Sequence, residues 1–138
     1  MKQKQFDRLL SYITRSVAKD NIKIEFADTK CLGFFDADAK LIQISDNISI
    51  REKASVIIHE WGHFLIFKKY NRYARKIDDT MYKNRSIVSK VYMISDEIKA
   101  WDVGVKRARK ICPRFVISWW FKNYRARALW SHIKFLAG

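Results

Sequence analysis

Hydrophobic residues recur along most of the chain at spacings typical of helices and strands. In residues 1–20, the apolar positions from Phe6 to Val17 are three or four residues apart, which predicts an amphipathic helix. In residues 21–45, "NIKIEF" alternates apolar and polar residues, and the runs "KCLGFF" and "AKLIQIS" flank "DADA" like the arms of a hairpin. We therefore expect a three-stranded antiparallel sheet after the first helix.

Two long helices are predicted in the middle of the chain. Ser49 and Glu52 have the spacing of a capping box, so a helix should begin there and cover residues 49–70. In residues 86–112, apolar residues recur in alternating steps of four and three, and this stripe should pack against another helix. Its members are Ile87, Val91, Ile94, Ile98, Trp101, Val105 and Ala108.

The C-terminal part of the chain predicts one more helix. Pro113 should end the preceding helix, and residues 114–136 then form a helix that is rich in aromatic and basic residues. Together with the sheet, these helices predict a single α+β domain over residues 1–138.

Composition supports a globular protein, with 49% hydrophobic residues, one Pro and four Gly in 138 residues. The two cysteines, Cys31 and Cys112, are isolated, which excludes both a C-x-x-C metal pair and a disulfide-rich scaffold. The N-terminal stretch lacks the apolar core of a signal peptide, and no apolar run approaches the ~20 residues of a membrane span. We therefore expect a cytoplasmic protein with no transmembrane segment.

The net charge of +14 is unevenly distributed. Residues 31–66 carry 3 basic and 5 acidic residues, whereas residues 67–138 carry 18 basic and 5 acidic ones. From Val103 to the end there are nine Lys and Arg, interleaved with aromatic residues, and no acidic residue. Residues 103–138 could thus bind nucleic acid or an acidic protein. Alternatively, the aromatic rings pack in the core and the charges form a solvated face.

The segment "HEWGH" places His59 and His63 four residues apart, on the same face of the predicted helix. Their ring nitrogens are then near enough to bind one ion at the ~2.0–2.1 Å distance that zinc requires. Glu60 lies about 100° around the helix from His59, where it could take a proton from a zinc-bound water. Two ordinary histidines in a packed helix are the alternative. Since the chain has three histidines and two fall at this spacing around a glutamate, a zinc site is favoured.

A catalytic zinc needs a third protein ligand and an open position for water. Glu97 projects from the edge of the apolar stripe and could reach an ion on the helix 49–70, whereas Asp96 turns another ~100° toward solvent. Asp102 flanks the stripe on its other side, either as an acceptor for a histidine N–H or as a surface acid. The remaining candidates are better explained as surface, packing or loop residues: His132, Asp78 and Asp79.

"HEWGH" after a small sheet, followed by a helix with "DEIKAWDVGVKRA", resembles the compact zincin metallopeptidases of the ImmA/IrrE type. The resemblance covers residues 21–110. It implies that Glu60 is the general base and that zinc has three protein ligands: His59, His63 and Glu97. Ala100 matches a small residue that lets the two helices approach.

The resemblance also concerns residues around the ligands. Trp101 stands where many glutamate-zincins have an acid, and Asp102 follows one residue later. Zincins bind extended substrate by adding it to an edge strand, and the strand Leu41–Ser45 is expected to be that edge because it is nearest the active helix in sequence. Oxyanion donors in such enzymes are often Tyr or His, and the candidates are Tyr70, Tyr73, Tyr82, Tyr92 and His132.

These observations predict a zinc-dependent metallopeptidase that hydrolyses peptide bonds in a specific protein target through a zinc-bound water activated by Glu60. The alternative is a nucleic-acid or acidic-protein binding module in which zinc is structural or the protease site is degenerate. Cleavage that depends on Glu60 would distinguish the two.

Overall fold

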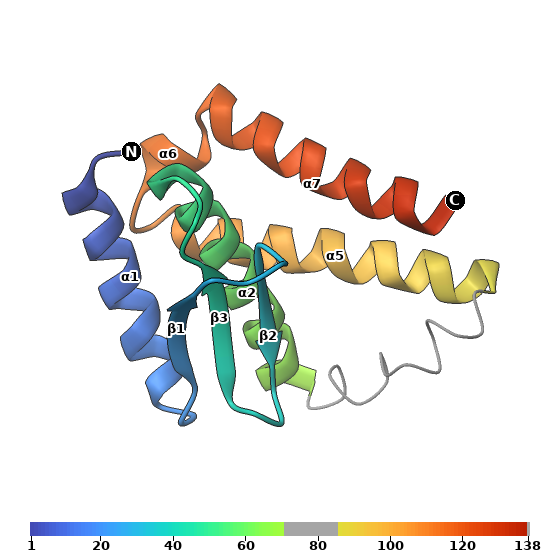
Figure 1. Ribbon diagram of the computed structural model, residues 1–138, viewed down its shortest axis with the longest axis horizontal. Coiled ribbons are helices and arrows are strands. Elements are labelled where there is room, and N and C mark those ends of the chain that lie inside the picture. The colour runs from blue at the N-terminus through green and yellow to red at the C-terminus, as the bar shows by residue number, and fades with distance from the viewer. Residues whose placement is uncertain (71–85, 138) are drawn as a thin grey trace.

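The computed structural model describes residues 1–70 and 86–137. Over these residues the protein is an α+β fold, as predicted, with a three-stranded sheet beside α2 and with α7 along the upper boundary of the molecule (Figure 1). The elements are α1 (Gln3–Ala18), β1 (Lys23–Ala27), β2 (Gly33–Asp36), β3 (Leu41–Ser45), α2 (Ile50–Tyr70), α5 (Ile87–Ala108), α6 (Pro113–Val116) and α7 (Trp119–Ala137).

The sheet has the strand order β1-β3-β2, with β1 parallel and β2 antiparallel to β3. The predicted hairpin is present, but the prediction of an entirely antiparallel sheet is wrong. β3 is the most apolar strand, and its Ile42 and Ile44 are fully buried, so a central place between two partners suits it best. The strand Leu41–Ser45 is therefore not an edge, and β1 and β2 form the two edges.

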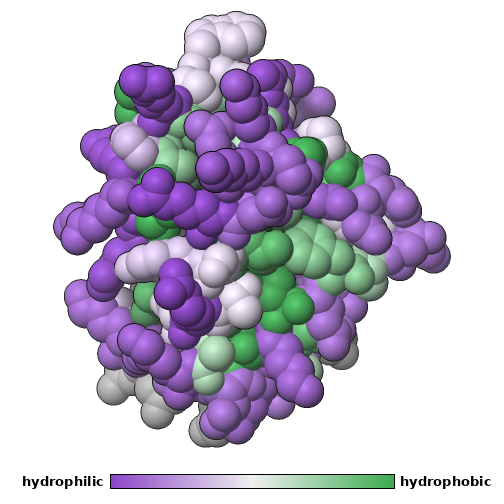
Figure 2. Space-filling view, turned by 90° about the vertical axis from the view of Figure 1, so that its left-hand side faces the viewer, coloured by the Kyte–Doolittle hydropathy of each residue, from purple (hydrophilic) through white to green (hydrophobic). Residues whose placement is uncertain are grey.

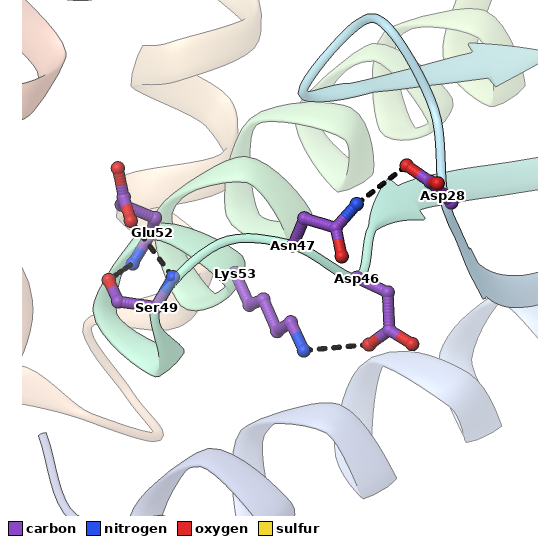
Figure 3. Close-up of polar contacts among 6 residues, drawn as sticks. All are labelled: Asp28, Asp46, Asn47, Ser49, Glu52 and Lys53. Carbon is purple, nitrogen blue, oxygen red and sulfur yellow. Dashed lines mark hydrogen bonds and ion pairs between the residues drawn. The ribbon is translucent and has the colours of Figure 1, made fainter.

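The start of α2 is fixed by the predicted capping box. Ser49 Oγ accepts a hydrogen bond from the Glu52 backbone N–H at 3.3 Å, and Glu52 Oε2 accepts one from the Ser49 N–H at 2.9 Å (Figure 3). Lys53 in the first turn forms a 2.8 Å ion pair with Asp46, the residue after β3 (Figure 3). The ion pair connects the beginning of α2, the helix that contains His59 and His63, to the end of the central strand β3.

Small residues let α2 and α5 approach closely. A Cβ atom added to Gly62 would lie 1.9 Å from the backbone oxygen of Ala100, and one added to Gly104 would lie 2.2 Å from that of Ile58. The expected close approach at Ala100 is confirmed: Gly62 of α2 lies against Ala100, and Gly104 follows Ala100 by one turn on α5. This crossing brings Glu97, one turn before Ala100, against the histidine face of α2.

The predicted apolar stripe of α5 is buried in its second half alone. Trp101, Val105 and Ala108 are buried, but Ile87 is 80% and Val91 60% exposed. The stripe was predicted to pack against another helix, and this is true of its C-terminal part. In the structure α2 and α5 cross, so the first turns of α5 extend beyond the contact (Figure 1).

The single helix predicted for residues 114–136 is two helices, α6 and α7. Ser118 lies at the break, where its Oγ donates to the Phe115 carbonyl at 2.6 Å and accepts from the Phe121 N–H at 3.3 Å. This side chain satisfies backbone groups at the end of one helix and the beginning of the next. The interruption redirects the chain, so that α7 returns over α5 (Figure 1).

The face of the molecule shown in Figure 2 is mainly hydrophilic, with hydrophobic residues exposed in limited groups between the polar ones. None of the described helices is both long enough and apolar enough to cross a membrane.

Candidate metal centre

Three side chains from α2 and α5 converge in the structure. His59 Nε2 lies 3.1 Å from His63 Nε2 and 2.8 Å from Glu97 Oε2. His63 Nε2 lies 3.4 Å from Glu97 Oε1. All three side chains are largely buried, with exposed fractions of 10%, 11% and 19%. The crossing of the helices thus brings together the three residues that the sequence predicts as zinc ligands.

The arrangement fits a zinc ion. Tetrahedral ligands at ~2.05 Å from a common ion lie about 3.3 Å from one another, and the observed separations are 2.8–3.4 Å. Glu97 Oε2 is buried and faces the ring nitrogens of His59 at 2.8 Å and His132 at 3.3 Å, without a well-aligned hydrogen bond to either. A cation would satisfy this oxygen. Two imidazoles and one carboxylate are a donor set typical of catalytic zinc.

Electrostatics also favour a positive charge in the cluster. Burial acts to raise the pKa of Glu97, but contacts with His59 and His63 lower this pKa well below its ordinary value. Burial acts to lower the pKa of His63, yet a hydrogen bond with Glu97 and the charge of Glu60 raise it above its ordinary value. The carboxylates therefore stabilise a cation here, whether it is a proton or a metal.

The ring of His59 is oriented by stacking. Trp101 lies against it, with ring centroids 4.5 Å apart and an interplanar angle of 27°. Nδ1 of His59 is buried and has no hydrogen-bond partner among the described residues. Asp102 does not supply this partner: it forms an ion pair with Arg125 of α7 and is 59% exposed. The stacked indole of Trp101 thus helps to hold the imidazole of His59 in its orientation.

A cavity of about 670 Å³ opens beside the three convergent side chains. Its wall includes Glu60, which is buried, and the strand β2. A volume of this size is typical of ligand-binding clefts. The lining therefore combines the predicted ligands, the predicted base and an edge strand that has no neighbour on its outer side among the described residues.

α7 lines the cavity with Ala128 and two polar side chains: His132, which was one of the candidate oxyanion donors, and Tyr124, which the sequence did not assign to the site. His132 Nε2 lies 3.3 Å from Glu97 Oε2, so His132, whose side chain is 45% exposed as expected of a surface residue, lies beside the predicted ligands. Tyr124 lines the same cavity, and its hydroxyl is buried without a hydrogen-bond partner among the described residues. Burial and the charge of Glu52 raise the pKa of Tyr124 to about 12.

The tyrosines that were expected near the site are different residues from Tyr124. Tyr70 and Tyr92 are 58% and 59% exposed and do not line the cavity. The remaining candidates lie outside the described residues, as does the connector with two acids: Tyr73, Tyr82, Asp78 and Asp79. For Tyr124, the signal in the sequence was weak, because it is one of many aromatic residues in the final helix.

No protein-family model, curated protein or solved structure matches this chain.

Proposed function

We propose that this protein is a zinc metallopeptidase of the compact zincin type. The observation that carries the proposal is the convergence of His59, His63 and Glu97 within 4.8 Å of one another, with Glu60 on the wall of the same cavity. The likeness to ImmA/IrrE-type peptidases supports it through the two motifs that contain these residues. Zinc at this site would supply a Lewis acid that polarises water and the substrate carbonyl.

Glu60 is placed to act as general base and then as general acid. It follows His59 on the helix and is buried beside the cavity, so its carboxylate can accept a proton from the attacking water. The same group can donate that proton to the nitrogen of the leaving amine. One carboxylate therefore accounts for both proton transfers.

Tyr124 is suited to stabilise the developing oxyanion. Its buried hydroxyl is protonated at neutral pH, far below its pKa of about 12, and among the described residues it has no hydrogen-bond partner. A substrate oxygen in the cavity would accept this hydrogen bond. His132 contacts Glu97 and helps to orient that ligand.

The edge strand β2 is suited to bind an extended peptide. Ser45 donates to the Leu32 carbonyl, and hydrogen-bonded pairs alternate along an antiparallel ladder. The backbone groups of Gly33 and Phe35 therefore point away from β3, toward the free edge. An added peptide strand would run past the cavity that contains Glu60. We infer that the substrate is a segment of a protein target and that the enzyme works in the cytoplasm.

The test compares the proteins cleaved by the wild type and by Glu60→Gln. The wild type and the variant should both bind one zinc per chain. The variant should lose cleavage activity by about 10²–10⁴-fold, because the general base is removed without a change of zinc ligand. Equal hydrolysis would contradict the role of Glu60. Bound zinc without any Glu60-dependent cleavage would favour the alternative, a binding module with a structural zinc.

A further inference from the structure

α7 has two faces of different character. Its inner face carries Phe121, Tyr124 and Ala128, which pack against the core. On the opposite side, Trp119 is 78% exposed and Trp130 is 57% exposed. Trp130 follows Trp119 by eleven positions, which corresponds to three helical turns plus about 20° and to ~16 Å along the axis. The two indoles therefore lie on one line along the outer surface of the helix.

Basic residues flank this line on both sides. Lys122, Arg127 and Lys134 are exposed and lie within about 80° of the tryptophan line around the helix. In the part of the chain that the structure describes, none of these three side chains forms an ion pair. Arg125, on another side of α7, forms an ion pair with Asp102. No acidic residue occurs after Asp102. The outer face of α7 is thus both aromatic and cationic.

The shape of this face selects among polyanionic partners. Proteins that bind single-stranded nucleic acid stack successive bases on aromatic rings along a groove. Here the indoles are ~16 Å apart on the outer side of α7. This helix forms the upper boundary of the molecule (Figure 1). A flat surface can touch both indoles at once. Indoles prefer the headgroup level of a bilayer, and flanking Lys and Arg bind anionic headgroups.

We propose that the outer face of α7 docks on an anionic lipid bilayer surface. The helix would lie in the plane of the interface, with Trp119 and Trp130 inserted and Lys122, Arg127 and Lys134 paired with headgroups. Tyr124 and His132, which line the cavity, are on the opposite side of the helix, so the cavity stays open when the protein is docked. This inference does not depend on the proposed peptidase activity.

Co-sedimentation with vesicles tests the proposal. The full chain should bind vesicles of phosphatidylcholine mixed with phosphatidylglycerol, and bind pure phosphatidylcholine vesicles at least about 10-fold more weakly. The double variant Trp119→Ala/Trp130→Ala should lose at least about 10-fold in affinity for the anionic vesicles. Lys122→Glu/Lys134→Glu should also lose at least about 10-fold.

The matched control is Lys4→Glu/Arg8→Glu on α1, which changes the net charge equally at exposed positions away from α7. It should bind vesicles more tightly than the α7 charge reversal does. Circular dichroism checks that every variant is folded. Absence of binding, equal losses in the two charge reversals, or unchanged binding by the double tryptophan variant would overturn the proposal. Tighter binding of duplex or single-stranded DNA through the same α7 residues would also overturn it, in favour of a nucleic-acid surface.

Discussion

Glu97 and Asp102 lie five residues apart on α5 but have different surroundings. Glu97 is largely buried between two histidines, and Asp102 is mainly exposed and paired with Arg125. Glu97→Ala should therefore abolish stoichiometric zinc binding, whereas Asp102→Ala should keep one zinc per chain. Elemental analysis of the two purified variants measures the difference. Zinc retained in full by Glu97→Ala would assign the third ligand to another residue.

Tyr124 provides a second distinction at the residue scale. Tyr124→Phe removes one hydroxyl and keeps the ring that stacks on Trp120. Because the hydroxyl has no partner among the described residues, the fold and zinc content should be unchanged. Loss of an oxyanion donor should lower kcat by about 10²-fold with a smaller effect on KM. An unchanged kcat would show that another group stabilises the oxyanion.

At the scale of elements, the crossing of α2 and α5 determines the geometry of the site. Gly104→Ala would place a Cβ against the Ile58 backbone oxygen, which cannot rotate away. Intrinsic helix propensity favours alanine by about 1 kcal/mol. The clash should nevertheless win and lower the free energy of unfolding by about 1–3 kcal/mol, since overpacking forces the backbones apart. Zinc affinity should fall as well, because Glu97 is two turns away on the displaced helix.

Denaturant unfolding and a zinc titration measure the two effects of Gly104→Ala. Ala126→Gly, at an exposed position of α7, is the control for helix propensity and should cost about 1 kcal/mol without changing zinc affinity. A Gly104→Ala variant as stable as the wild type would contradict the close crossing.

Local signals predicted single elements well. The capping box located the start of α2, and "DADA" located the hairpin turn, where Asp36 accepts hydrogen bonds from the backbone N–H groups of Asp38 and Ala39. The order of strands was not predictable in this way, because alternation tells which face a residue occupies and not which strand is its neighbour. The break at Ser118 was missed because a single serine, which can cap a helix, stands there within a continuous run of residues that are compatible with a helix.

At the scale of the whole molecule, zinc should link the site to stability. Its proposed ligands come from two helices, so zinc would bind the folded chain in preference to the unfolded one. Free zinc at about 100-fold above its Kd would add about 2.7 kcal/mol. For a chain of this size, that corresponds to a rise in Tm of about 10 °C. Thermal scans before and after chelation measure the shift, and an unchanged Tm would argue against tight binding by these ligands.

The path of the whole chain determines which site residues could be predicted from the sequence. His59, Glu60 and His63 are recognisable because their spacing on one helix has a chemical meaning, and Glu97 because it borders the apolar face of the next helix. His132 and Tyr124 reach the cavity only because the chain turns at Ser118 and α7 returns over α5. Such long-range placement leaves no periodic signal in the sequence.

The two cysteine thiols differ in exposure, and this difference allows a crosslinker to be attached at one of them. Cys31 is exposed at the lining of the cavity, whereas burial raises the pKa of Cys112 to about 11, so a maleimide at neutral pH should react with Cys31 first. A photoreactive group attached there would stand beside the edge strand β2. Irradiation of the labelled Glu60→Gln variant would then join the protein covalently to whatever polypeptide occupies the cavity, and mass spectrometry of the adduct would identify it.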